Sequence, residues 1–246
     1  MELVPSIDVR GGRAVRLFQG EFARETRAPM TPARLFRRFA GAGVRWVHIV
    51  DLDGARDGVA GNRAVLRALA GQGGPRIQAG GGIRRLADVE CLLADGVERA
   101  VVGSIAIESP STVADWVRRF GAERLVAALD VRLEPEGTPR LATHGWQRAS
   151  PHTLWEHAER LAAAGVRHVL CTDIGRDGAL AGPNVGLYRE CVRRFPAFSW
   201  QASGGVRDAA DLHALAATGV ACAISGRALI EDRIPLREIA PFLPAA

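Results

Sequence analysis

Lysine is absent from this chain of 246 residues, so all 32 of its lysine-or-arginine positions are arginine. The absence excludes catalysis through a lysine Schiff base. Against the arginines stand 27 acidic residues, which leaves a formal net charge of +5. Because no five-residue stretch is solidly basic, the sequence does not predict the concentrated cationic surface that nucleic-acid binding requires. We therefore expect no nucleic-acid partner.

Cysteine is also scarce, and the four cysteines have neither a CxxC spacing nor that of a zinc site: Cys91, Cys171, Cys191 and Cys222. We interpret them as buried free thiols in a reducing compartment, which predicts a cytoplasmic protein. No apolar run approaches the ~20 residues that span a bilayer, and the charges of Glu2 and Asp8 argue against a secretion signal. No membrane partner is therefore expected.

Metal-ligand spacing is missing as well. Four histidines share no such spacing, and we interpret them as strand or helix-surface residues: His48, His152, His157 and His168. The sequence also contains no dinucleotide fingerprint. We predict neither a metal nor an organic cofactor.

Short apolar runs alternate with longer helical patterns along the whole chain, which predicts parallel strands joined by helical crossovers. The predicted strands are 3–7, 46–50, 76–79, 100–102, 125–129, 168–172, 199–202 and 221–225. The predicted helices are 32–42, 62–70, 86–94, 110–120, 151–164, 184–195, 208–217 and 235–242, with Ser109-Pro110 and Ser150-Pro151 as helix starts. Eight such units in about 250 residues predict an α/β protein with a single (β/α)8 TIM barrel domain over residues 1–246.

An internal repeat supports the barrel. Residues 78–107 align without a gap on residues 201–230, with 14 identities in 30 positions. Residues 42–51 match residues 164–173, and the first strand, which ends in SIDVR, matches ALDVR at 128–132. The offset is half the chain, so we predict two duplicated half-barrels, at about 1–122 and 123–246.

Carboxylates recur where the repeated strands end, which is where the active sites of such barrels lie. Asp8 and Asp130 end the first and fifth strands, on opposite sides of the barrel. Because an unpaired buried charge is costly, we interpret this pair as catalytic rather than as loop caps or partners of neighbouring arginines. Asp51 and Asp173 end the second and sixth strands, and for them the capping interpretation is favoured, although Asp173 is kept as a candidate for substrate binding.

Glycine-rich turns follow the remaining strands of each half. Adjacent glycines let backbone N–H groups point at an anion, so two symmetric turns predict a substrate with a phosphate at each end, although any single Gly-Gly is more often an ordinary tight turn. The candidate phosphate-binding residues are Gly81, Gly82, Gly103 and Ser104 in the first half, and Gly204, Gly205, Gly226 and Arg227 in the second.

Several motifs resemble one known family. They are VRLFQG at 15–20, HIVDLDGA at 48–55, GGGIR at 80–84, Gly145-Trp146, TDIGRDGALAGPN at 172–184 and GRAL at 226–229. Together they resemble the phosphoribosylformimino-5-aminoimidazole carboxamide ribotide isomerases of histidine biosynthesis, from the first strand to the last. The resemblance implies an Amadori rearrangement of an aminoaldose to an aminoketose on a small bisphosphorylated substrate, and we expect a monomer.

The same resemblance implies roles for individual residues. Asp8 becomes the general base that removes the C2 proton of the opened sugar, and Asp130 the general acid that protonates the ring oxygen; the residues alone give the pair without the roles. Thr172 orients a reacting group, unless it is simply a β-branched strand residue. Arg16 and Gln19, in VRLFQG, are candidates for substrate binding.

Trp146 is implied to stack on the imidazole carboxamide, with a hydrophobic plug as the alternative. The loop over residues 133–149 is longer than usual for the family, with prolines at 135 and 139, so the sequence leaves its placement over the site open.

Three other functions stay open at this point. The cyclase subunit of imidazole glycerol phosphate synthase is a sister barrel, but it uses a lysine near its site and has a different first strand. A relaxed isomerase would also accept phosphoribosylanthranilate. A non-catalytic sugar-phosphate binder would be expected to lack Asp8 or Asp130, and both are present.

Overall fold

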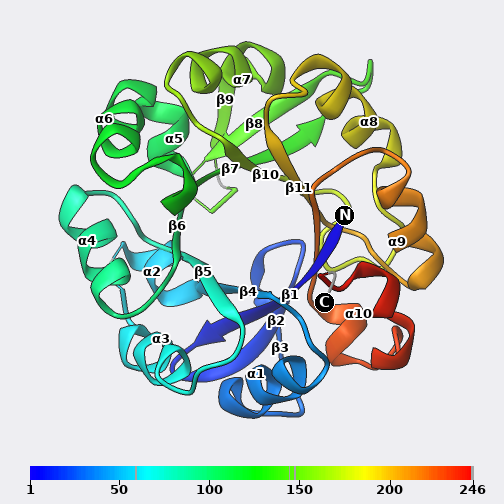
Figure 1. Ribbon diagram of the computed structural model, residues 1–246. Helices are drawn as coiled ribbons and strands as arrows, with labels where there is room; N and C mark the ends of the chain where they lie inside the picture. Colours follow the sequence, from blue (N-terminus) through cyan, green and yellow to red (C-terminus); the bar gives the residue numbers. More distant parts are fainter. Residues whose placement is uncertain (59, 144, 147, 245–246) are drawn as a thin grey trace.

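A closed barrel of parallel strands forms the centre of the molecule, with helices around it (Figure 1). The computed structural model describes residues 1–58, 60–143, 145–146 and 148–244. Within them the barrel strands, in order around the barrel, are β1 (Glu2–Arg10), β4 (Trp46–Asp51), β5 (Arg76–Gly80), β6 (Arg99–Val102), β7 (Leu125–Leu133), β10 (His168–Asp173), β11 (Ser199–Ser203) and β12 (Cys222–Ser225). Pairing of β12 with β1 closes the ring. Each predicted strand overlaps one of these, so the prediction of a (β/α)8 barrel is confirmed.

The helices form the outer ring. They are α1 (Pro32–Gly41), α2 (Leu52–Asp57), α3 (Arg63–Ala70), α4 (Leu86–Ala94), α5 (Ser104–Glu108), α6 (Pro110–Phe120), α7 (Leu154–Ala163), α8 (Val185–Arg194), α9 (Ala209–Ala216) and α10 (Arg227–Ile230). Short 3₁₀ turns lie at η1 (Ala122–Arg124), η2 (Leu236–Glu238) and η3 (Ala240–Phe242). None of the helices in the described ranges combines the length and the apolar character needed to cross a bilayer.

Alternation along each strand decides what points into the barrel. In β1, Leu3, Ile7 and Val9 pack outward against the helices, whereas Val4 belongs to a separate cluster inside the barrel. Because side chains alternate, Asp8 points inward from the same face as Val4, near the carboxyl end of the strand. The same count on β7 points Asp130 inward. Strand periodicity alone therefore aims both carboxylates at the barrel interior.

In each half, the first strand is followed by two antiparallel strands that we did not predict. In the first half β2 (Arg13–Phe18) pairs with β1 and with β3 (Glu21–Arg27). In the second half β8 (Pro139–Thr143) pairs with β7 and with β9 (Arg148–Thr153). Positive φ angles at Gly11 and Gly12 allow the tight turn between β1 and β2. Both hairpins extend the barrel at its carboxyl-terminal end.

Two predicted helix boundaries were wrong. The helix expected from Pro151 begins at Leu154, because Thr153 and Glu156 form a capping box and Pro151 lies in the edge strand β9. The helix expected over 235–242 consists of the two 3₁₀ turns η2 and η3, and Pro241 within the second removes a backbone donor that an α-helix would need.

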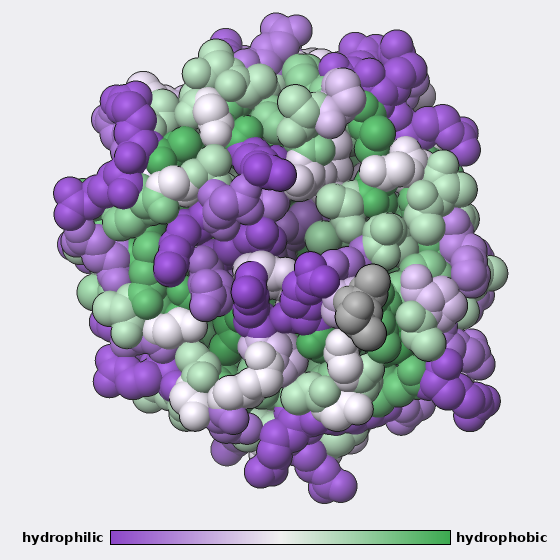
Figure 2. Space-filling model, in the orientation of Figure 1, coloured by the Kyte–Doolittle hydropathy of each residue, from purple (hydrophilic) through white to green (hydrophobic). Residues whose placement is uncertain are grey.

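The face on which the barrel strands begin is closed by charged residues. Figure 2 shows hydrophilic residues gathered over the centre of this face. There Glu123 forms an ion pair with Arg167 at 2.9 Å and lies 2.9 Å from His168 Nε2, and Glu2 pairs with Arg45 at 3.1 Å. The predicted catalytic residues lie at the opposite end, where the strands finish.

Candidate active site

A cavity of about 280 Å³ opens where the barrel strands end. Predicted site residues from both halves line it: Asp8, Arg16, Gly81, Gly82, Gly103, Ser104, Asp130, Trp146, Thr172 and Gly226. Closure of the barrel thus brings residues as distant in the sequence as Asp8 and Gly226 to one surface. The predicted residues Gln19, Asp173, Gly204, Gly205 and Arg227 do not line the cavity.

Asp8 has a cation beside it. Arg16, on the neighbouring strand β2, donates from Nη1 to the Asp8 carboxylate at 2.9 Å, and both side chains are largely buried. Burial raises the pKa of Asp8, while the charge of Arg16 and a hydrogen bond from Ser6 act in the opposite direction. The guanidinium therefore favours the ionised carboxylate, which is the form that can accept a proton.

Among the described residues, the hydrogen-bond donors to Asp130 are neutral groups. The indole Nε1–H of Trp146 donates to its carboxylate at 2.8 Å, and Thr172, which pairs with Asp130 in register on the adjacent strand β10, adds its hydroxyl. Burial raises the pKa of Asp130, and these two hydrogen bonds offset part of that rise. The charge of Arg16 acts to lower the pKa of Asp8, whereas the described hydrogen bonds to Asp130 come from neutral groups, so the surroundings of the two carboxyls differ.

A third carboxylate, Asp177, lines the cavity and was missed in the sequence. Burial raises its pKa to about 6, with the charges of Asp8 and Asp130 acting in the same direction and Arg16 against them. The signal was present, because Asp177 belongs to an RDG triplet that occurs in both halves. In the first half that aspartate is Asp57, which is half exposed and pairs with Arg56. The repeat therefore gave no reason to place one copy in the cavity.

The first glycine turn lies open to the cavity. Gly81 and Gly82 have φ of +116° and +78°, and a Cβ would collide with the backbone of Asp51, at the end of β4, or of Gly54, in α2. These two positions thus require glycine for close packing of two loops, whatever they bind. Gly103 and Ser104 complete this side of the cavity.

The second glycine turn is covered by an arginine. A Cβ on Gly226 would collide with the guanidinium of Arg16, which lies against it. Arg16 Nε is buried and has no hydrogen-bond partner among the described residues. Arg227 instead donates to the Gly178 carbonyl at 2.7 Å and to Glu231 at 2.7 Å. The two turns therefore differ, and Arg16 places a positive charge at the second one.

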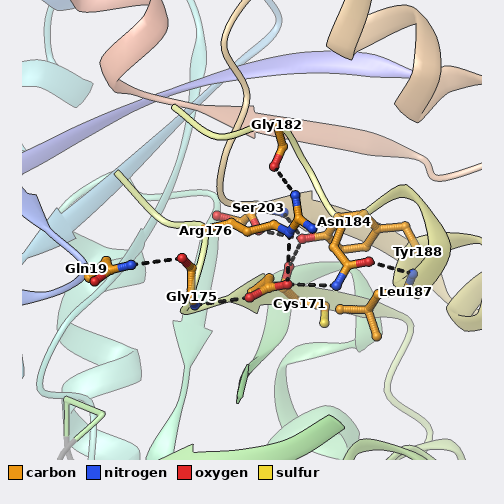
Figure 3. A network of polar contacts seen from close by, with 10 residues as sticks. Gln19, Cys171, Gly175, Arg176, Gly182, Asn184, Leu187, Tyr188 and Ser203 are labelled. Atoms are coloured by element: carbon orange, nitrogen blue, oxygen red, sulfur yellow. Dashed lines mark hydrogen bonds and ion pairs between the residues drawn. The ribbon is translucent and has the colours of Figure 1, made fainter. Parts of the chain in front are cut away.

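Asp173 and Gln19 belong to a network that ties loops together (Figure 3). The Asp173 carboxylate accepts hydrogen bonds from the Gly175 N–H at 3.0 Å and from Asn184 at 2.8 Å, and it is 4% exposed. Gln19 donates to the Gly175 carbonyl at 2.9 Å. The structure thus places both away from the cavity wall, and it supports the capping interpretation of Asp173 rather than direct contact with a ligand.

Comparison with known proteins assigns this chain to a family. The family described as "Histidine biosynthesis protein" matches residues 2–235. This chain belongs to that family. It is 44% identical over 236 residues to a protein of Idiomarina loihiensis (96% of each chain), 45% identical over 234 residues to one of Stenotrophomonas maltophilia (95% of this chain, 96% of the relative), and 43% identical over 236 residues to one of Proteus mirabilis (96% of each). All three relatives are named 1-(5-phosphoribosyl)-5-((5-phosphoribosylamino)methylideneamino) imidazole-4-carboxamide isomerase.

The histidines of this family member occupy three different environments. His48 lines the cavity, with Nδ1 3.2 Å from Gln78 Nε2, and burial lowers its pKa to about 4. His168 pairs with Glu123 at the other end of the barrel. His157 is 0% exposed, so its interpretation as a helix-surface residue was wrong. In the part of the chain that the structure describes, no group of three or more His, Cys, Asp or Glu side chains could hold a metal.

Proposed function

We propose that this protein catalyses the aldose-to-ketose isomerisation that gives its relatives their name. The observation that carries the proposal is a pair of partly buried carboxylates on opposite strands, Asp8 beside a cation and Asp130 hydrogen-bonded by the Trp146 indole. An isomerisation by proton transfer needs one group that starts ionised and one that starts protonated. The proposal also agrees with the first glycine turn, which lines the cavity, with Gly226 of the second turn beside Arg16, and with the bisphosphorylated compound in the relatives' name.

The proposed reaction consists of ring opening followed by proton transfers between C2 and C1. Asp130 donates a proton to the ring oxygen as the C1–O bond breaks, which leaves the opened sugar with a C1=N iminium. Asp8 removes the proton from C2, and the electron pair of that C–H bond forms C1=C2 and neutralises the nitrogen. Transfer of the C2 hydroxyl proton to C1 then gives the ketone. Arg16 keeps Asp8 ionised at the start, and Thr172 and Trp146 orient Asp130.

Trp146 and Arg16 also have proposed binding roles. Trp146 has a positive φ of +71°, lines the cavity and lies with its ring against Gly20 on the β2–β3 hairpin, which supports a position of this residue over the site; residues 144 and 147 fall outside the described ranges. Stacking of the indole on the imidazole carboxamide and contact of Arg16 with a phosphate are proposals that these positions support.

Purified protein incubated with the bisphosphorylated formimino substrate should change the absorbance as the sugar isomerises. Absence of turnover by folded protein would overturn the proposal. Phosphoribosylanthranilate, supplied in a parallel assay, tests the relaxed isomerase, which nothing in the relatives' names favours. The same names do not favour the cyclase.

We further propose that the enzyme works in the cytoplasm as a monomer, without nucleic acid, membrane, metal or organic cofactor. The support is the chemistry, since proton transfer between neighbouring carbons needs only an acid and a base. Extensive chelation should leave turnover unchanged, and recovery of lost activity on adding a divalent ion would contradict the proposal.

A further inference from the structure

A proline interrupts the hydrogen bonding of the short helix beside the first glycine turn. Helix α5 follows Gly103 directly, and α6 starts at Pro110. In an α-helix the carbonyl of Ala106 would accept from the N–H of residue 110, but proline has none. The N–H of Ser109 is already used, because it donates to the Ile105 carbonyl at 2.9 Å. The Ala106 carbonyl therefore needs a donor from outside the helix.

His157 supplies that donor from α7. Its Nε2 lies 2.7 Å from the Ala106 carbonyl oxygen, and the side chain is 0% exposed. Because a carbonyl only accepts, Nε2 carries the hydrogen and Nδ1 is left as an acceptor. Nδ1 is buried without a hydrogen-bond partner among the described residues, and burial lowers the pKa of His157, so the ring stays neutral.

The other half of the barrel shows why the histidine is needed only once. The repeat places Leu35, also 0% exposed, at the position equivalent to His157. It places Arg233 at the position equivalent to Pro110, and the backbone N–H of Arg233 donates to the Ala228 carbonyl at 2.8 Å. There the Leu229 carbonyl, the counterpart of Ala106, accepts from Asp232 at 3.4 Å within its own turn. The histidine therefore accompanies the proline and is absent where the proline is absent.

We propose that His157 is a positioning residue for the first phosphate-binding turn, which it holds in place through Ala106. This inference rests on the proposed function, because that function makes Gly103 and Ser104 part of a phosphate site. Helix α5 is only 5 residues long, so its position is set by contacts from outside rather than by its own length. Loss of the hydrogen bond to the Ala106 carbonyl should displace the backbone amides of Gly103 and Ser104. Such a displacement weakens binding, because binding groups must be held to within about 0.5 Å of their productive positions.

The test uses inorganic phosphate and ¹⁵N-labelled protein, with amide shifts read at Gly103, Ser104 and Gly226. His157→Leu copies the other half and should weaken phosphate binding at Gly103 and Ser104 by about fivefold, the size expected from losing one neutral hydrogen bond. Binding at Gly226 should not change. His157→Gln retains an N–H donor and should recover most of the loss. In steady-state assays, His157→Leu should raise KM with little change in kcat.

A matched control separates positioning from general weakening of the helix. Leu161 lies on the same helix and is also 0% exposed, but its side chain has no group that could donate a hydrogen bond to Ala106. The variant Leu161→Ala should therefore lower the melting temperature and leave the phosphate titration unchanged. Equal weakening by Leu161→Ala, or no weakening by His157→Leu, overturns the role of His157 alone. If wild-type Gly103 and Ser104 do not respond to phosphate at all, the phosphate site of the proposed function is wrong, and this inference falls with it.

Discussion

The two halves of the barrel share several buried hydrogen bonds and differ in the residues that surround their catalytic candidates. Asp51 accepts from the Asn62 side chain at 2.6 Å, and its counterpart Asp173 accepts from Asn184 at 2.8 Å. At the centre, Gln78 and Gln201 exchange amide hydrogen bonds at 2.7 and 3.2 Å across 123 residues of sequence. Equivalent residues of the two halves thus make equivalent buried contacts.

The hairpins show where the halves diverge. Each half adds an antiparallel hairpin beside its first strand, but β2 brings Arg16 to Asp8, whereas the connection from β8 to β9 brings Trp146 to Asp130. A cation and an indole favour different protonation states of the carboxylates they contact. The repeat thus places two carboxylates at equivalent positions, and the different hairpins give them unequal surroundings.

The strongest test of this comparison removes each carboxylate in turn. Asp8→Asn and Asp130→Asn keep the side-chain shape and remove proton transfer, so each should lower kcat by ~10²–10⁴. Steady-state kinetics with the bisphosphorylated substrate measures the loss. Retention of more than about a tenth of the wild-type kcat by either variant would show that its carboxylate does not transfer the proton.

Arg16→Gln tests whether the cation makes Asp8 the base. Without the guanidinium, the pKa of Asp8 rises, so the acidic limb of the kcat/KM profile should move to higher pH. The loss at pH 6 should be about tenfold or more, since hydrogen bonds to charged groups contribute about 1.5–3 kcal/mol. A limb at the wild-type pH, with only KM raised, would limit Arg16 to binding phosphate.

Asp177→Asn tests the carboxylate that has no buried counterpart. Its pKa of about 6 predicts an ionisation near that pH in the wild-type profile, which the variant should lack. We expect about a tenfold fall in kcat, less than for Asp130→Asn, because Asp177 acts on the pair through its charge. Asp57→Asn, at the exposed equivalent position, serves as the control and should have no effect. If Asp177→Asn alone abolishes the basic limb, then Asp177, and not Asp130, donates the proton.

A difference far from the cavity should affect stability alone. Asp95 accepts from Arg63 at 2.8 Å and Arg67 at 2.9 Å, whereas the repeat places Thr218 at this position in the second half. Burial raises the pKa of Asp95, but the hydrogen bonds and charges of the two arginines outweigh it, so the pKa is lowered. Asp95→Thr should therefore lower the melting temperature by about 2–4 °C per kcal/mol lost, with kcat unchanged.

The pH dependence gives the sign of that effect. A carboxyl whose pKa is lowered by folding stabilises the protein above its unfolded pKa, and this contribution is lost as the pH falls through the folded pKa. The difference in melting temperature between wild type and Asp95→Thr should therefore shrink as Asp95 becomes protonated. A difference independent of pH would assign the loss to packing. Asp115→Thr, at an exposed ion pair with Arg118, is the control and should have little effect at any pH.

Local patterns sufficed for the barrel strands and failed for the hairpins. Strands such as β10 are buried along their whole length and read as apolar runs, whereas most residues of β3 are exposed and carry charges. Backbone pairing holds β3 in place, and side-chain periodicity does not record it. The start of α7 was misplaced because two capping signals lay close together, and Thr153 with Glu156 prevailed over Ser150 with Pro151.

The sequence by itself determined the barrel, its duplication and the paired aspartates, because these follow from periodicity and from an offset that can be counted along the chain. Only the tertiary structure decided what surrounds each aspartate: Arg16 beside Asp8, Trp146 on Asp130, Asp177 in the cavity, and His157 on the Ala106 carbonyl. Burial and hydrogen-bond partners depend on residues that are distant in sequence and adjacent only after the barrel closes. Protonation states, which those partners set, are therefore properties of the folded chain.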